Sequence, residues 1–162
     1  MNGVIKNYAI GGAVGATLYL EPAATLDVDV FVILPESTES SLLSLWPIYE
    51  YLGQRGGQVQ REHIVIGGWP VQFLPPGNEL EQEAISEAVA VTVQDVPTRI
   101  MTAEHLVAIA LRTAGAKDHA RIVQFVEQNA VDVGRLKNLL ERHGLATKWN
   151  EFERKFLGGR DE

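Results

Sequence analysis

The feature that most constrains the fold of this chain is a pair of aspartates, Asp27 and Asp29, at the start of a strongly apolar segment. Residues i and i+2 of a strand point to the same face, so the two carboxylates should project together, about 6–7 Å apart. Two like charges at that separation repel and raise one pKa, unless a cation lies between them. The segment from residue 25 to 34 therefore predicts a buried strand whose first residues hold a divalent cation.

Mg²⁺ is the cation that this pair predicts, with Mn²⁺ as the alternative. Mg²⁺ prefers oxygen ligands and usually takes one or two carboxylates together with substrate phosphates. The upstream Gly11-Gly12 step would let backbone N–H groups approach such phosphates. The other interpretation is that both aspartates are solvated loop residues or cap a helix. Unpaired charge is costly among apolar neighbours, which favours the metal site.

These residues also carry a family resemblance. The order of Gly11-Gly12, then Thr25-x-Asp27-x-Asp29, then a strand rich in Val, Phe and Ile resembles the signature of the nucleotidyltransferase superfamily, which has the DNA polymerase β-like fold.

Two later segments fit the same family. Residues 71–76, VQFLPP, resemble the strand that carries the family's third carboxylate. Residues 104–118, which run from Glu-His-Leu to Lys-Asp, resemble a helical segment of small bacterial members, including toxins of toxin–antitoxin pairs. The resemblance spans residues 8 to 130.

The resemblance implies Mg²⁺-dependent transfer of a nucleoside monophosphate from a nucleoside triphosphate to an acceptor. The acceptor is not identified by the sequence and could be RNA, a protein or a small molecule. Asp27 and Asp29 would be catalytic and would hold the metal. The implied substrate-binding residues are Gly11, Gly12, Thr25, Lys117 and Asp118. The alternative for the Lys-Asp pair is a helix cap beside a solvated charge.

Three departures from the family pattern favour a rival function. Gln72 occupies the position at which the third carboxylate is expected. Its side-chain carbonyl could still bind the metal, but a neutral ligand binds Mg²⁺ more weakly than a carboxylate does. Ala23 and Ala110 replace an arginine and a lysine that many members carry. Arg112 or Lys117 could supply the missing positive charge. The rival is a catalytically degenerate nucleotide-binding or partner-binding module, for example in a toxin–antitoxin pair.

Other interpretations of the motifs fit less well. A haloacid-dehalogenase-type site places its aspartates after the apolar strand, and Ile10 occupies the first glycine position of a dinucleotide-binding motif. Glu62 could replace the third carboxylate only if a hairpin register turned it inward. The histidines lack metal-ligand spacing and are expected at the surface or in packing; they are His63, His105, His119 and His143.

The periodicity predicts an α+β fold, with a small mixed sheet and flanking helices over residues 1–97 and a helical bundle over residues 98–162. The expected strands are 7–10, 25–34, 59–66, 69–74 and 91–96. The expected helices are 13–20, 41–54, 79–89, 102–114, 117–129, 132–143 and 146–157.

The amino-acid composition and the distribution of charge limit the expected cellular compartment and the expected binding partners. Residues 1–111 carry 4 Lys and Arg against 13 Asp and Glu, whereas residues 112–162 carry 10 against 8. An acidic body argues against broad nucleic-acid binding, so a nucleic-acid contact would use the C-terminal third. The absence of cysteine fits a cytoplasmic protein. The apolar run at residues 8–20 is too short to span a membrane, although a signal peptide is the alternative. An antitoxin or a second copy of the chain is the expected protein partner.

Overall fold

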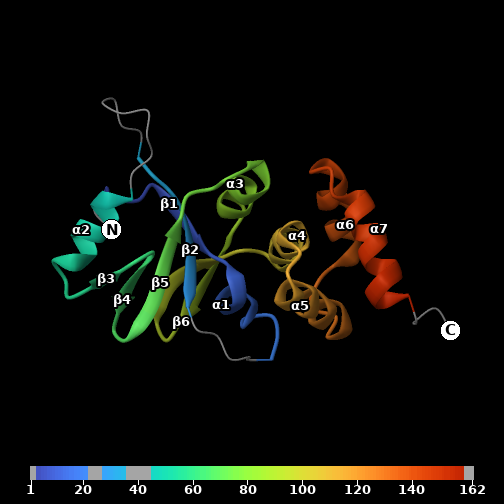
Figure 1. Cartoon of the computed structure of the whole chain (residues 1–162), viewed down its shortest axis with the longest axis horizontal. Coiled ribbons are helices and arrows are strands. Elements are labelled where there is room, and N and C mark those ends of the chain that lie inside the picture. Colours follow the sequence, from blue (N-terminus) through green and yellow to red (C-terminus); the bar gives the residue numbers. More distant parts are fainter. Residues whose placement is uncertain (1–2, 22–26, 36–44, 159–162) are drawn as a thin grey trace.

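A mixed seven-stranded sheet forms one part of the molecule, and a group of helices packs beside it (Figure 1). The computed structural model describes residues 3–21, 27–35 and 45–158. The α+β fold class predicted from the sequence is confirmed.

The central strand of the sheet is the one that carries Asp29. The strand order is β3-β4-β5-β2-β1-β7-β6, with β2 parallel to β5 and antiparallel to β1. The strands are β1 Asn7–Ile10, β2 Val28–Ile33, β3 Gln58–Gln60, β4 His63–Ile66, β5 Trp69–Leu74, β6 Val89–Val93 and β7 Val96–Ile100.

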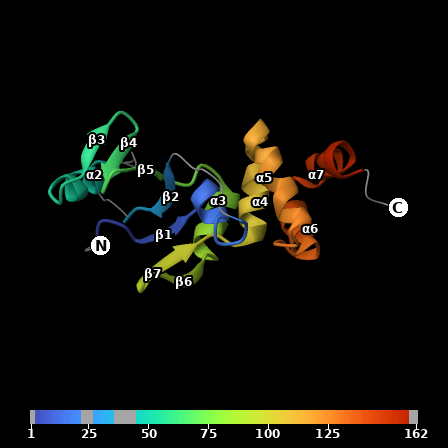
Figure 2. The same ribbon diagram turned by 90° about the horizontal axis from the view of Figure 1, so that it is seen from below.

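Helices cover both faces of the sheet and extend beyond it. Their bounds are α1 Gly12–Ala16, α2 Trp46–Gly53, α3 Glu79–Ser86, α4 Ala103–Thr113, α5 Ala116–Glu127, α6 Val133–Arg142 and α7 Ala146–Phe152, followed by a π-helical turn at Glu153–Leu157. In the turned view, α2 and the β3–β4 hairpin lie at one end of the molecule, and α6 and α7 lie at the other (Figure 2). Within the described residues, no helix combines the length and the apolar character needed to cross a bilayer.

Alternating residues of β2 pack into two different cores, as the period of a strand requires. Val32 lies in a small cluster with Phe73 of β5 and Ile48 of α2. Phe31 points to the opposite face and belongs to a larger cluster that includes residues of α3 to α7. One continuous core therefore joins this face of the sheet to the C-terminal helices.

Local sequence signals account for one hairpin and for two helix starts. The Gly67-Gly68 turn has φ of 57° and 85° and joins antiparallel strands β4 and β5. The Thr102 side chain accepts the His105 backbone N–H at the start of α4. The Asp132 side chain accepts the backbone N–H of Arg135 at the start of α6 in the same way.

The segment from residue 59 to 66 is two strands, so the prediction of a single strand there is wrong. β3 and β4 form an antiparallel hairpin whose turn holds Arg61, at φ 55°, and Glu62. The turn contains no glycine, proline, asparagine or aspartate, which are the residues that usually mark one in a sequence.

The predicted strand at 91–96 is also a hairpin, formed by β6 and β7. Its turn is Gln94-Asp95, with φ of 48° and 65°. Pro97 lies inside β7 and does not end the strand, contrary to the prediction. Among the described pairings, β7 meets β1 only where Ile100 lies opposite Ile10, so the backbone at Pro97 faces no second ladder on that side.

Two predicted helices are shorter than expected, and a third can be compared with its prediction only in part. α1 ends at Ala16 and gives way to turns, and α3 ends at Ser86 because Val89 already belongs to β6. α2 begins at Trp46, and the residues predicted to precede it, 41–44, lie outside the described residues.

Candidate active site

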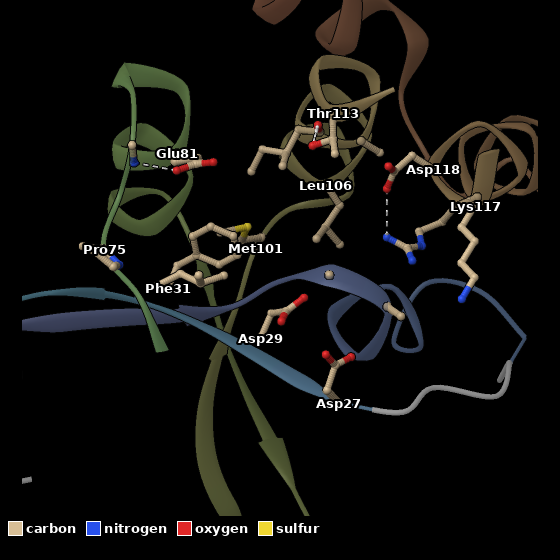
Figure 3. Close-up of a pocket in the computed structure, with 17 residues that line it drawn as sticks. Asp27, Asp29, Phe31, Pro75, Glu81, Met101, Leu106, Thr113, Lys117 and Asp118 are labelled. Atoms are coloured by element: carbon tan, nitrogen blue, oxygen red, sulfur yellow. Dashed lines mark hydrogen bonds and ion pairs between the residues drawn. The ribbon is translucent and has the colours of Figure 1, made fainter. Parts of the chain in front are cut away.

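A cavity of about 640 Å³ opens between the Asp29 face of the sheet and helices α3, α4 and α5. Asp27, just before β2, and Asp29 and Phe31, within β2, form its floor (Figure 3). Lys117 and Asp118, from the first turn of α5, lie on the opposite side of the cavity. The cavity therefore brings together five of the described site residues predicted from the sequence, since Gly12 lines it as well.

The two aspartates behave as the alternation of a strand predicts. Both line the cavity, Asp27 one residue before β2 and Asp29 within it. Burial raises the pKa of the Asp29 carboxyl, and the negative charge of Asp27 raises it further. Arg121 and His63 act in the opposite direction but do not cancel these effects. The pair therefore carries an electrostatic strain that a cation between the carboxylates would relieve.

Gly12 is fixed by its contact with Asp29. Its φ is 58°, a left-handed conformation, and a Cβ atom at this position would overlap Oδ2 of Asp29. At Gly11, a Cβ atom would press on the Phe31 ring and on the Met101 sulfur, at 2.9 and 3.0 Å. The Gly11 N–H donates to the Asp29 carbonyl at 3.0 Å. Glycine at both positions is thus required for α1 to begin directly against the aspartate strand.

Two cationic side chains line the cavity from α5, Lys117 and Arg121. Lys117 was predicted as a site residue and Arg121 was not, although residues four apart share one face of a helix. Arg112 does not share in this lining; it is exposed at the end of α4, and its carbonyl accepts a hydrogen bond from Lys148.

Asp118 has structural partners within its own helix. Its Oδ2 accepts the backbone N–H of Gly115 at 3.1 Å, which caps α5, and its Oδ1 lies 3.9 Å from Nη1 of Arg121. The cap predicted as the alternative for this residue is therefore present. Asp118 still lines the cavity and holds Arg121 at its edge.

Gln72 lies beside Asp29, because the two residues are opposite each other on the parallel strands β5 and β2. This is the neighbourhood in which the resemblance expects a third carboxylate. The described lining of the cavity does not include Gln72. Ala110, where a lysine is expected, is part of the cavity wall. Thr25 and Ala23 lie outside the described residues.

A second cavity, of about 610 Å³, shares Asp27 with the first and is lined by the β3–β4 turn and neighbouring residues. Glu62 and His63 belong to it, and Glu62 is exposed. His63 Nε2 lies 3.4 Å from Oδ2 of Asp27. The contact arises because Ile64 and Val28 both lie opposite Val71 on β5, a register that no local sequence pattern reveals.

The expectation that all four histidines serve only surface or packing roles needs correction. His63 contacts Asp27, while His105 and His143 both lie against Glu83 of α3. His119 does pack as expected, between the rings of Phe152 and Phe156.

Comparison with known proteins identifies the fold. Neither a family model nor a curated protein matches the sequence. Among solved structures, the chain is similar to an antigenic nucleotidyltransferase-like protein from Paracoccidioides brasiliensis, with a TM-score of 0.60 and 14% identity over 94% of this chain and 81% of that one. It is also similar to the antibiotic-resistance factor ANT(2'')-Ia, with a TM-score of 0.52 and 15% identity over 91% and 86% of the two chains. The chain has the nucleotidyltransferase fold that the resemblance predicted.

The raised pKa of Asp29 makes a prediction about stability. The folded protein binds a proton at Asp29 more tightly than the unfolded chain, so the free energy of unfolding should fall as the pH rises from the ordinary aspartate range through the raised pKa. Asp29→Asn should therefore be more stable than the wild type at pH 7 in EDTA and should lose part of this pH dependence. Urea unfolding between pH 4 and 7 measures both effects.

The control for this experiment is Asp95→Asn, in the exposed β6–β7 turn, which should leave the profile unchanged. A less stable Asp29→Asn protein at pH 7 would show that the Asp29 carboxylate is stabilised as an anion in the metal-free fold.

Proposed function

We propose that this chain is a nucleotidyltransferase, which transfers a nucleoside monophosphate from a nucleoside triphosphate to an acceptor group. The observation that carries the proposal is the position of two adjacent carboxylates, Asp27 and Asp29, on the floor of a 640 Å³ cavity that faces two cationic side chains. A volume of this size lies within the range of small-molecule and cofactor sites. The shared fold supports the same activity.

The aspartate pair fits Mg²⁺ or Mn²⁺. Both ligands are carboxylates, and the raised pKa of Asp29 marks an uncompensated negative charge that a divalent ion would neutralise. When bound, such an ion neutralises charge that develops on the phosphates and lowers the pKa of the attacking hydroxyl. Asp27 and Asp29 would hold the ion, and the close contact of Gly12 with Asp29 restrains the Asp29 carboxylate for this role.

Lys117 and Arg121 would bind the triphosphate. A nucleoside triphosphate carries several negative charges, and the described lining of the cavity supplies these two cations from one face of α5. Asp118 restrains the arginine through their ion pair. The apolar part of the lining, which includes Phe31, Met101 and Leu106, is suited to a base or to an apolar part of the acceptor.

The second candidate function is a nucleotide-binding module without transferase activity. Gln72 beside Asp29 and Ala110 in the cavity wall favour it, since both positions lack a charge that the family resemblance expects. The two functions share nucleotide binding and differ in turnover. An antitoxin, a second copy of the chain, and RNA, a protein or a small molecule as acceptor remain predictions from the sequence.

Metal-dependent nucleotide binding is the first test of the proposal. Calorimetric titration with each of the four nucleoside triphosphates should show binding in Mg²⁺ that EDTA abolishes. Asp27→Asn/Asp29→Asn should weaken this binding at least about tenfold, because both carboxylate ligands of the ion are lost. Release of pyrophosphate from the bound nucleotide then separates the enzyme from the binding module. Folded wild-type protein that binds no nucleotide under any condition would refute both functions.

The role of α5 can be tested with Lys117→Ala. This variant should bind the triphosphate roughly tenfold more weakly, since a charge-assisted contact contributes about 1.5–3 kcal/mol. Its affinity for the corresponding nucleoside, which has no phosphate, should not change. Arg112→Ala is the matched control, because it removes a cation that does not line the cavity. Equal losses for nucleoside and triphosphate would place Lys117 away from the phosphates.

Gln72→Asp tests the missing carboxylate directly. A third negative charge beside Asp29 should strengthen Mg²⁺ binding, so nucleotide binding should reach half-saturation at a Mg²⁺ concentration several-fold lower. Gln94→Asp, in the exposed β6–β7 turn, adds the same charge away from the cavity and should have no such effect. An unchanged Mg²⁺ requirement in Gln72→Asp would indicate that residue 72 lies outside the metal's reach.

A further inference from the structure

A second group of side chains that could bind a metal lies where α3 meets α4, apart from the Asp27–Asp29 cavity. Glu83 belongs to α3, Glu87 follows its last residue, and His105 lies in the first turn of α4. One oxygen from each glutamate and one ring nitrogen of the histidine all lie within 4.8 Å of one another. The two glutamates are four residues apart, so they share one side of the α3 end.

His105 is the residue that points to a bound ligand at this group of side chains. The residue is only 4% exposed, and its buried Nε2 atom has no hydrogen-bond partner among the described residues. The nearest oxygen of Glu83 is 3.9 Å away, too far for a hydrogen bond. A buried polar atom of this kind costs free energy unless something binds it.

The other ring nitrogen of His105 is already held. Nδ1 lies 2.7 Å from Oγ1 of Thr102, the residue that caps α4. If Nδ1–H donates to this hydroxyl, Nε2 presents a lone pair toward the carboxylates. Histidines that bind metals usually donate their second N–H to a neighbouring oxygen, which sets the tautomer and the ring orientation.

We propose that Glu83, Glu87 and His105 bind a divalent transition-metal ion of the Zn²⁺ type. Imidazole nitrogen and carboxylate oxygen are both Zn²⁺ ligands, with bonds of about 2.0–2.2 Å, whereas Mg²⁺ prefers oxygen alone. Tetrahedral ligand atoms at such bond lengths lie about 3.4 Å apart, close to the observed distance between His105 and Glu83. Glu87 is exposed, so its side chain can close the remaining gap.

The charge state of the ligands fits this assignment. Burial lowers the pKa of His105, more than the nearby glutamates raise it, which favours the neutral imidazole that metals require. Burial alone would raise the pKa of Glu83, but hydrogen bonds from Arg142 and His143 outweigh this and keep it low. Arg142 and His143 orient the Glu83 carboxylate but leave it able to accept a further ligand, since a carboxylate offers about four lone-pair sites.

The ion would reach the site through a separate cavity of about 460 Å³. Glu87 and His105 line this cavity together with Asn138 and Arg142 of α6. A metal there would join α3 to α4, and through the partners of Glu83 also to α6. Its expected effect is to stabilise the junction between the sheet and the C-terminal helices, independently of the proposed transferase activity.

The test uses Zn²⁺ itself, in a protein from which the aspartate site has been removed. Asp27→Asn/Asp29→Asn should still bind about one Zn²⁺ per chain in a calorimetric titration, in preference to Mg²⁺. Adding Glu87→Gln should weaken this binding at least about tenfold. Glu87 is exposed, so its loss should not prevent folding. Glu151→Gln, an exposed glutamate on α7, is the matched control and should leave Zn²⁺ affinity unchanged.

A spectroscopic readout assigns the ligand. The chain has four histidines, so the ¹⁵N side-chain spectrum is simple. Zn²⁺ should shift Nε2 of His105 in the double variant, and after Glu87→Gln the same shift should need a Zn²⁺ concentration at least about tenfold higher. The proposal is overturned if the folded double variant binds no Zn²⁺, if Glu87→Gln binds it equally well, or if the shifted signals belong only to the other three histidines.

Discussion

The close approach of the Asp29 carboxylate to the backbone of Gly12 is the constraint on which the candidate active site depends. The first turn of α1 lies so close to the Asp29 side chain that a Cβ atom at residue 12 could not fit between them. This contact buries part of Asp29 and holds it near Asp27, and burial and that neighbour together raise its pKa. The same contact that makes the carboxylate unfavourable in the metal-free protein also holds it in place for a cation.

The parts of the fold that could be predicted from sequence were those in which local chemistry determines the result. Gly67-Gly68 specifies its hairpin, Thr102 and Asp132 specify helix starts, and the apolar run after Asp29 specifies a buried strand. The hairpin turn at Arg61-Glu62 was missed because it contains none of the usual turn residues, although Arg61 adopts a positive φ. The turn at Gln94-Asp95 was missed because Pro97 was expected to end the strand, whereas it lies inside β7.

The residues of the candidate sites also fall into two classes, those found from the sequence and those that only the folded structure brings together. Asp27, Asp29 and Gly12 were found from local residue patterns, and Lys117 was found from the family resemblance; all four line one cavity. The contact of His63 with Asp27 depends on the pairing of three strands, and the group at Glu83, Glu87 and His105 depends on two helices that meet in space. Arg121 could have been predicted from the sequence, because its four-residue spacing from Lys117 is a local pattern.

Part of the lining of the cavity is formed by side chains that also belong to the protein core. Phe31, Met101 and Leu106 line the cavity and also belong to the cluster that joins the sheet to the C-terminal helices. A substitution that reshapes the cavity there also alters the packing of the whole molecule, and most such changes cost stability. Exposed lining positions such as Thr113 and Lys117 are free of that constraint. Divergence in substrate preference should therefore accumulate at this rim, while the interior of the cavity changes slowly.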